Sequence, residues 1–191
     1  MRQATIERAT RETKIALTVD LDGGERAIQT GIGFFDHMLN SFALHGNLGL
    51  SVVCQGDLHV DCHHSVEDVG IVLGQAVAQA LGDKRGIERF AHSCIPMDEA
   101  LATCVMDISG RPFLVFDASF PQERVGEFDT CMTGEFFRAF AYQSGITLHL
   151  KCPYGTNSHH MIEAMFKAAG RALSKAAAQT GTEIKSAKGV L

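Results

Sequence analysis

The chain carries one five-residue pattern twice, and this duplication constrains its fold more than any other feature of the sequence. His-His-x-x-Glu occurs at residues 63–67 and again 96 positions later, at residues 159–163. Small residues after the motif match at the same spacing, in the pairs Gly74 and Gly170, Ala76 and Ala172, and Ala80 and Ala176. The similarity therefore runs through a whole helix, and the sequence predicts two similar halves that share one core.

The spacing within the motif favours metal binding. At the start of a helix, residues i and i+4 lie on one face, whereas adjacent residues point about 100° apart. The first histidine and the glutamate of each copy can therefore bind one metal ion, while the second histidine is directed toward another. An isolated pair of histidines is more often a solvated helix start. Two copies in register, each with a carboxylate at the same position, instead indicate a two-metal site.

Composition and charge argue against several classes of partner. The 191 residues are 46% apolar, which suffices for one well-packed domain or two small ones. A net charge of −5 and a pI near 6.0 argue against a nucleic-acid partner. Residues 1–20 are too charged for a signal peptide or a membrane span. The six cysteines form no C-x-x-C pair, so we predict reduced thiols in a cytoplasmic protein, and only Cys62 adjoins the first motif.

The first half of the chain shows alternating and amphipathic patterns. Residues 5–21 are predicted to be a strand, and residues 22–24 a hairpin turn into a second strand at 26–30. A helix is predicted at 33–46 and a strand at 48–54, followed by the motif helix. About four strands and two helices are expected per half, which is an α+β arrangement with the helices on one sheet face.

The second half repeats this order, with strands at 102–107, 112–117 and 146–152 and a helix at 134–145. The correspondence extends upstream at a spacing of 87, in the pairs Glu12 and Glu99, and Asp20 and Asp107. The boundary is predicted near residues 83–91, where the segment Gly-Asp-Lys-Arg-Gly at 82–86 ends a helix. We therefore predict a first repeat at 1–88 and a second at 89–191. The tail from residue 181 is small and polar, a composition typical of disorder.

Five histidines and three carboxylates are the candidate metal ligands, namely His37, His63, His64, His159, His160, Glu67, Glu135 and Glu163. Shared between two octahedral ions, eight ligands give four to each ion and leave two positions open for substrate or water. Imidazole and carboxylate ligands without thiolate suit Mn²⁺, Fe²⁺, Ni²⁺ or Zn²⁺ better than Mg²⁺ or Cu⁺, and the sequence does not select among them. The other histidines are predicted to be structural or exposed: His45, His59, His92 and His149.

Motifs throughout the chain resemble those of imidazoleglycerol-phosphate dehydratase, an enzyme of histidine biosynthesis, in its form without a fused phosphatase. The similarity covers essentially the whole length and rests on residues 11–13, 21–23, 35–39, 62–68, 98–100, 109–112, 158–163 and 186–189. Three positions depart from the family pattern: Cys62 stands where Asp is frequent, Glu135 where some members have a metal-binding His, and Lys185 where Pro is common. At Glu135 a carboxylate would therefore replace an imidazole.

The resemblance implies two ribosomal S5 domain 2-like repeats, with helices packed between two four-stranded sheets. It implies removal of water from D-erythro-imidazole glycerol phosphate to give imidazole acetol phosphate, with two Mn²⁺ ions per active site. Each ion would bind one ring nitrogen and stabilise an imidazolate, whose electrons expel the hydroxyl to leave a diazafulvene-like intermediate. It further implies a hollow shell of 24 subunits, with metal sites at contacts between chains.

The resemblance also assigns roles to individual residues. Glu163 is the candidate base, and Glu12, which would also contact the substrate, or Asp98 would handle the departing hydroxyl and the later protonation. The candidate phosphate ligands are Arg89, Arg111, Lys167, Ser186 and Lys188. Guanidinium groups suit phosphate because they form two parallel hydrogen bonds with it. The tail would then act as a lid that becomes ordered on the substrate.

Two other functions fit part of this pattern. A two-metal phosphoesterase also combines histidine and carboxylate ligands with basic phosphate clamps, although such enzymes usually draw their ligands from Asp-rich strand ends. A metal-storage shell protein would need the metal ligands but not Arg89, Arg111 and Lys188. The product formed from imidazole glycerol phosphate separates the three functions.

Overall fold

The computed structural model describes residues 2–191, which form two repeats of three strands, a helix, a strand and a helix. The first repeat comprises β1 (Gln3–Ala9), β2 (Thr13–Asp20), β3 (Arg26–Gln29), α1 (Gly33–His45), β4 (Gly49–Gly56) and α2 (His63–Leu81). The second comprises β5 (Phe90–Met97), β6 (Ala100–Asp107), β7 (Phe113–Ala118), α3 (Met132–Ser144), β10 (Thr147–Cys152) and α4 (Ser158–Ala176). A short hairpin of β8 (Arg124–Val125) and β9 (Phe128–Asp129) is inserted before α3. Within residues 2–191, no helix has the length and apolar character needed to cross a membrane.

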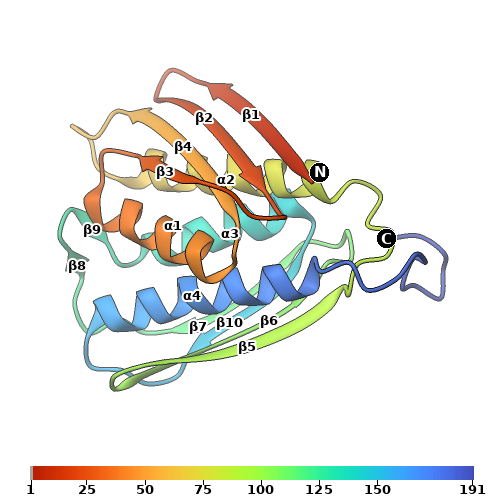
Figure 1. The fold of residues 1–191 in the computed structure, drawn as a ribbon. Coiled ribbons are helices and arrows are strands. Elements are labelled where there is room, and N and C mark those ends of the chain that lie inside the picture. Colours follow the sequence, from red (N-terminus) through yellow and green to blue (C-terminus); the bar gives the residue numbers. More distant parts are fainter. Residues whose placement is uncertain (1) are drawn as a thin grey trace.

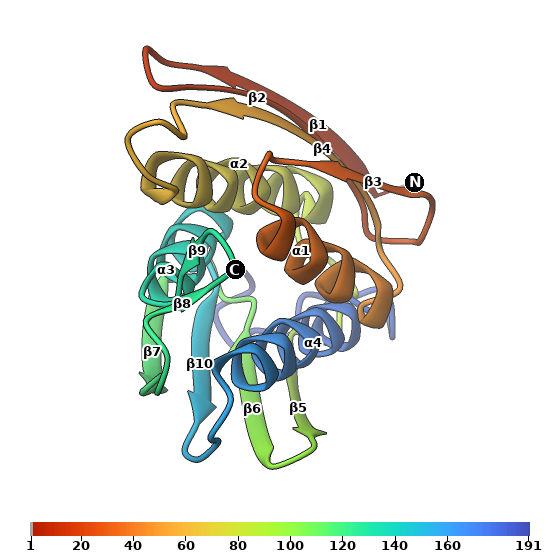
Figure 2. The same cartoon turned by 90° about the vertical axis from the view of Figure 1, so that its left-hand side faces the viewer.

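Each repeat forms a four-stranded sheet, and the helices lie between the two sheets (Figure 1). The strand orders are β1-β2-β4-β3 and β5-β6-β10-β7, so the two sheets have the same topology. In each sheet the last strand of this order pairs parallel and the others pair antiparallel. Figure 2, turned by 90°, shows the same layers. The predicted α+β fold, with helices between two four-stranded sheets, is confirmed.

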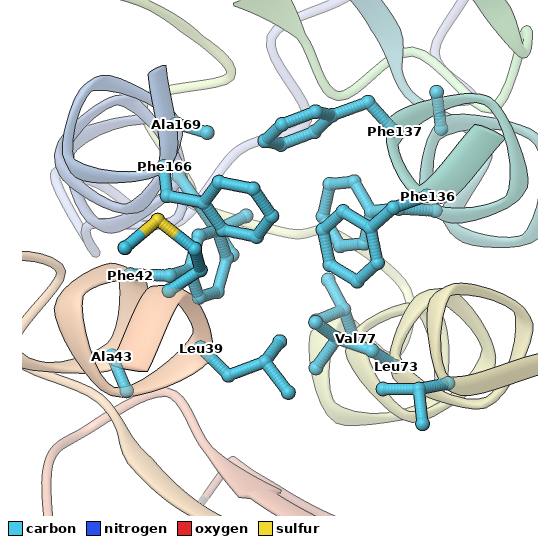
Figure 3. Packing of buried hydrophobic residues seen from close by; sticks show 14 of the residues in the cluster. Leu39, Phe42, Ala43, Leu73, Val77, Phe136, Phe137, Phe166 and Ala169 are labelled. Atoms are coloured by element: carbon cyan, nitrogen blue, oxygen red, sulfur yellow. The ribbon is translucent and has the colours of Figure 1, made fainter. Parts of the chain in front are cut away.

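The helices pack across the repeats. α1 packs against α4, and α2 packs against α3, so each pair joins a helix of the first repeat to a helix of the second. Phe136 from α3 and Phe166 from α4 stack with ring centroids 5.0 Å apart, next to Leu39 from α1 and Leu73 from α2 (Figure 3). Because all four helices contribute to one cluster of buried side chains, the repeats share a single core.

The strand predicted at residues 5–21 is instead the hairpin of β1 and β2. The Thr10 hydroxyl accepts hydrogen bonds from the backbone N–H groups of Glu12 (3.1 Å) and Thr13 (3.0 Å), which turns the chain. The equivalent strand β5 is absent from the sequence prediction. Its inward positions include Ser93 while Phe90 points outward, so its hydrophobic alternation is weak.

The predicted hairpin between β2 and β3 is wrong. β4 lies between these strands, antiparallel to β2 and parallel to β3. Gly23 has a φ of 109°, and a Cβ on Gly49, the first residue of β4, would lie 3.0 Å from the Gly23 carbonyl oxygen. Glycine at these positions therefore permits the close passage of β4 beside the turn. The second repeat behaves in the same way, because β10 separates β6 from β7.

Candidate metal centre

Both motifs occupy the first turns of α2 and α4, where nearby side chains fix the start of the helix. Asp61 accepts a hydrogen bond from the backbone N–H of His63 (2.7 Å), and Asn157 accepts one from the backbone N–H of His159 (2.9 Å). These bonds satisfy backbone donors that a helix start leaves free. The first histidine of each motif is therefore anchored in the same way in both repeats.

The structure brings His37, His159 and Glu163 together between α1 and α4. Nε2 of His37 and Nε2 of His159 lie 3.3 and 3.1 Å from the same oxygen, Oε2 of Glu163. One ligand atom from each residue lies within 4.8 Å of the other two, and no other such group of three occurs within residues 2–191. Close helix packing permits this convergence, because a Cβ on Gly170 would lie only 2.1 Å from the carbonyl oxygen of Phe42. The group combines one side chain from the first repeat with two from the second.

The carboxylate at the centre of this group is buried, with a relative exposure of 6% for Glu163. Burial raises the pKa of Glu163, but the hydrogen bond and charge of Lys167 and the nearby His37 lower it by more, so the pKa lies below its usual value. Nζ of Lys167 lies 2.7 Å from Oε1, which leaves Oε2 to the two imidazoles. An ionised carboxylate facing two imidazole nitrogens is a donor set that fits a divalent transition metal.

The α2–α3 pair carries a more open version of this arrangement. Nε2 of His63 lies 3.1 Å from Oε2 of Glu67. Glu135 lines the same groove between α2 and α3 as Glu67, but its carboxylate accepts a hydrogen bond from Arg138 (2.7 Å). The structure thus forms a His-Glu pair here and places Glu135 beside it, paired with an arginine.

The second histidine of each motif has a carboxylate partner other than the glutamate of its own motif. The rings of adjacent histidines are 6.2 Å apart in the first motif and 6.1 Å apart in the second. Nδ1 of His64 lies 3.0 Å from Asp57, and Nδ1 of His160 lies 2.8 Å from Glu99. These hydrogen bonds raise the pKa of His64 and of His160. The bond from His160, together with backbone N–H donors that include those of Thr156 and Asn157, lowers the pKa of Glu99 to about 2. Each second histidine is therefore held by a carboxylate on one ring nitrogen.

The two carboxylates predicted to handle the departing hydroxyl, Glu12 and Asp98, lie near Nε2 of the second histidines. Oε1 of Glu12 lies 3.7 Å from Nε2 of His64, and Oδ2 of Asp98 lies 3.7 Å from Nε2 of His160. Each occupies the turn between the first two strands of its sheet. Asp98 has a φ of 48°, a conformation that is strained for a residue other than glycine and often found at functional positions.

Two carboxylates of this group, Asp57 and Glu99, were not predicted from the sequence as partners of the second histidines. They lie 7 and 61 positions from those histidines. Asp57 lies in the loop before α2, and Glu99 lies in the turn between β5 and β6, so neither shares a helix with its histidine. The contacts arise only when these segments fold back on the helix starts. Glu99 was visible in the sequence as the duplicate of Glu12, but not as a partner of His160.

The predicted phosphate ligands Arg89 and Arg111 converge on Asp107. Arg89 donates hydrogen bonds to both Asp107 carboxylate oxygens (2.8 and 3.2 Å), and Nη2 of Arg111 lies 3.5 Å from Oδ2. Arg89 also donates to the carbonyl of Lys185 (2.5 Å). Asp107 therefore holds two cationic side chains beside the tail.

The tail from residue 181 is folded against the connection between α2 and β5. Lys185 pairs with Glu88 (2.6 Å), and the backbone N–H of Gly189 donates to the carbonyl of Ser186 (3.0 Å). The Ser186 hydroxyl accepts a hydrogen bond from the backbone N–H of Lys188 (3.2 Å). The predicted tail residues Ser186 and Lys188 therefore share one turn, next to the segment that leads to Arg89.

Within one chain, the group of His37, His159 and Glu163 lies at the first turns of α4, whereas the tail follows the other end of this helix (Figure 1). The backbone N–H of Arg89 donates to Ala176, the last residue of α4 (2.8 Å), whereas His159 is in the first turn. At ~1.5 Å per residue these positions are about 25 Å apart along the helix. Lys167 belongs to the other group, since it pairs with Glu163. One small phosphorylated molecule cannot contact both groups in a single chain.

Known sequences are similar to the chain over nearly all of its length. Residues 30–173 match the sequence model of the family described as imidazoleglycerol-phosphate dehydratase. A protein of that name from Rhodopseudomonas palustris (strain TIE-1) is 56% identical, over 100% of this chain and 99% of its own length. Another, from Acetivibrio thermocellus, is 57% identical, over 92% of this chain and 90% of its own length.

Two solved structures are similar to the fold. The imidazoleglycerol-phosphate dehydratase of Staphylococcus aureus superposes with a TM-score of 0.85 at 42% identity, covering 94% of this chain and 99% of its own. The enzyme of Pyrococcus furiosus superposes with a TM-score of 0.85 at 33% identity, covering 97% of this chain and 100% of its own.

Proposed function

The chain belongs to the imidazoleglycerol-phosphate dehydratase family, and from this premise we propose that it carries out the family's reaction with two manganese ions bound by its repeated motifs. The reaction removes water from D-erythro-imidazole glycerol phosphate to give imidazole acetol phosphate, a step of histidine biosynthesis. The enzyme is therefore a lyase that breaks a carbon–oxygen bond.

The group of His37, His159 and Glu163 is the observation that carries the metal proposal. It offers three ligand atoms within 4.8 Å of one another, and three ligands leave further positions of an octahedral ion open. Nitrogen and carboxylate donors without thiolate suit Mn²⁺. We assign the second ion to His63 and Glu67, with Glu135 as a ligand once its bond to Arg138 is broken.

We propose that each site is completed by a neighbouring chain. His64 and His160 belong neither to the group of His37, His159 and Glu163 nor to the pair of His63 and Glu67, so we assign them to ions held mainly by other chains. The distance of about 25 Å between the metal and phosphate candidates of one chain supports the same conclusion. A closed shell of 24 subunits would supply such contacts. We also propose a cytoplasmic location, which the absence of disulfides among the six cysteines supports.

Manganese bound at these sites would supply positive charge that stabilises electrons on the imidazole ring of the substrate. Glu163 would remove the proton from the substrate carbon that also bears a hydroxyl group. Lys167 would keep the Glu163 carboxylate ionised and hold it in place through Oε1. Glu12 or Asp98 would give a proton to the departing hydroxyl, which leaves as water. After taking up a proton from solvent, the same carboxyl group would supply the proton for the later protonation.

Phosphate binding is proposed for Arg89 and Arg111, with Ser186 and Lys188 closing over it from the tail. Arg89 and Arg111 are held side by side by Asp107, which supports a paired guanidinium clamp. Lys167, far along α4 from Arg89, would meet the phosphate only through a contact between chains.

The direct test is incubation of the Mn²⁺-loaded protein with imidazole glycerol phosphate. Formation of the enolisable ketone imidazole acetol phosphate is expected, without release of inorganic phosphate. Phosphate release without the ketone would assign a two-metal phosphoesterase, and binding of metal without turnover would assign a storage protein.

A further inference from the structure

The second histidines share a feature that the reaction of the family does not by itself require. In both motifs, Nδ1 of the second histidine faces a carboxylate, Asp57 at 3.0 Å for His64 and Glu99 at 2.8 Å for His160. In both, Nε2 faces the opposite way, toward Glu12 or Asp98 at 3.7 Å. The same division of the two ring nitrogens thus occurs twice in one molecule.

The carboxylate of Glu99 is itself fixed by the backbone. Oε1 accepts hydrogen bonds from the N–H groups of Thr156 (2.9 Å) and Asn157 (2.8 Å), in the loop that leads into α4. Oε2 remains for Nδ1 of His160. The Glu99 side chain therefore links the turn between β5 and β6 to the start of the motif helix, and the position of its free oxygen is set before any ligand binds.

Asp57 is fixed in a different way. Its backbone N–H donates to the carbonyl of Glu12 (3.1 Å), and its own carbonyl accepts from Val60 (2.8 Å). These bonds close the loop between β4 and α2, and they leave both carboxylate oxygens within 3.1 Å of Nδ1 of His64.

The two carboxylates do not occupy equivalent positions of the repeats. Glu99 corresponds in sequence to Glu12, which faces Nε2 of His64, whereas Asp57 follows β4 and has a different origin. A contact inherited from the duplication would use the same position twice. The repeats have instead reached the same hydrogen bond with different residues, which indicates that the bond itself is required.

A carboxylate on Nδ1 determines which nitrogen of a histidine can bind metal. Because an ionised carboxylate only accepts hydrogen bonds, Nδ1 carries the proton of the neutral ring. Nε2 lies 3.7 Å from Glu12 or Asp98, beyond hydrogen-bond distance, and keeps its lone pair. Such partners also fix the orientation of the ring, and their loss typically lowers metal affinity about 10–100-fold.

We propose that Asp57 and Glu99 are positioning residues that hold His64 and His160 in the tautomer whose Nε2 binds metal. This inference rests on the metal site of the proposed function. It adds two residues that touch neither substrate nor ion and that act only through the histidines.

The test measures tautomer and metal affinity separately. Solid-state ¹⁵N spectra of histidine-labelled, metal-free protein report which ring nitrogen carries the proton, and the signals of His64 and His160 are assigned by their loss in His64→Gln and His160→Gln. In unsubstituted protein, at a pH at which the rings are neutral, both rings are expected to carry their single proton on Nδ1. Protonation at Nε2 instead would overturn the inference, and this measurement does not depend on the folding of an Asp57 or Glu99 variant.

The matching variants are Asp57→Ala and Glu99→Ala, with Mn²⁺ affinity measured by competition with a chelator. Each should lower affinity about 10–100-fold and shift its own histidine toward the other tautomer. Asp61→Asn is the control, because it removes a carboxylate charge near the same helix start but keeps an oxygen that can cap His63. It should change Mn²⁺ affinity less than about threefold and leave the tautomers unchanged.

Lost affinity with unchanged tautomers, or an equal loss in Asp61→Asn, would overturn the positioning role. Failure of the unsubstituted protein to bind Mn²⁺ would refute the proposed metal site itself. That failure is distinguishable because it is seen before any substitution is made.

Discussion

Replacing Gly170 with alanine should destabilise the protein, although alanine is the better helix former. Gly170 lies where α4 crosses α1, and a Cβ there would be 2.1 Å from the carbonyl oxygen of Phe42 and 2.9 Å from its carbonyl carbon. Ordinary contact begins at 3.4 Å, so the two helices must separate by about 1.3 Å. The obstacle is backbone, which cannot turn aside as a flexible side chain can.

The expected size follows from two opposing terms. Overpacking costs about 1–3 kcal/mol, and the better helix propensity of alanine offsets about 1 kcal/mol. The net loss is therefore up to about 2 kcal/mol, and we expect the upper end because the Cβ would meet backbone at 2.1 Å. For a domain of this length each kcal/mol lowers the melting temperature by roughly 2–4 °C. The shift of α1 should also move His37 away from Glu163, now 3.3 Å away, and weaken Mn²⁺ binding.

Gly134→Ala is the matched control. It lies inside α3, and the nearest atom to its Cβ would be Phe116 Cδ1 at 3.7 Å, an ordinary contact. It should therefore gain up to about 1 kcal/mol. Both variants are compared by denaturant unfolding of metal-free protein at one protein concentration. If Gly170→Ala proves as stable as Gly134→Ala, the close packing of α1 on α4 does not set the geometry of the site.

Further predictions concern the ligands, the tail and the assembly. His64→Ala and His160→Ala should each abolish turnover and lower metal content, because one of about four protein ligands is lost. Full metal occupancy with a normal rate, by elemental analysis and product assay, would remove that histidine from the site. Lys188→Ala, or truncation after Ala187, should raise KM strongly with metal content unchanged, and unaltered kinetics would refute the lid. Chelation should shrink the particle in light scattering and Mn²⁺ should restore it, because a ligand bound only by the assembled state stabilises assembly. Constant size would place each site within one chain or a metal-independent contact.

The sequence predicted the helices well because their signals are local. The helix predicted at 33–46 appears at Gly33–His45, and the duplicated Gly74 and Gly170 lie where helices of different repeats cross. A period of 3.6 and a small residue at a contact are both visible without the partner.

Strand pairing could not be predicted in the same way. Asp22 to Gly24 has the composition of a hairpin turn, which predicts that β2 and β3 pair with each other. The strand that lies between them is β4, from residues 49–56, and the turn carries no signal for it. The first turn of the chain, at Thr10, was hidden because a threonine in a run of strand formers gives no turn signal until its hydroxyl is seen to bond the backbone.

In the candidate site, too, contacts within one helix could be predicted from the sequence, whereas contacts between distant segments could not. His159 and Glu163 could be placed on one helix face from their spacing, and their distance of 3.1 Å agrees with it. The contact of His37 with Glu163 joins segments 126 positions apart, and the contact of Glu99 with His160 joins segments 61 positions apart. Long-range contacts of this kind are set by tertiary packing, which no single-sequence period encodes.

The most direct test of the metal proposal is anomalous X-ray scattering from crystals of the Mn²⁺-loaded protein, recorded on both sides of the manganese edge. Two manganese peaks per chain are expected, one bound by His37, His159 and Glu163 and one by His63 and Glu67, each with a second histidine from a neighbouring chain. Manganese absent from the His37 group in a crystal of active enzyme, or two sites each completed within a single chain, would contradict the account.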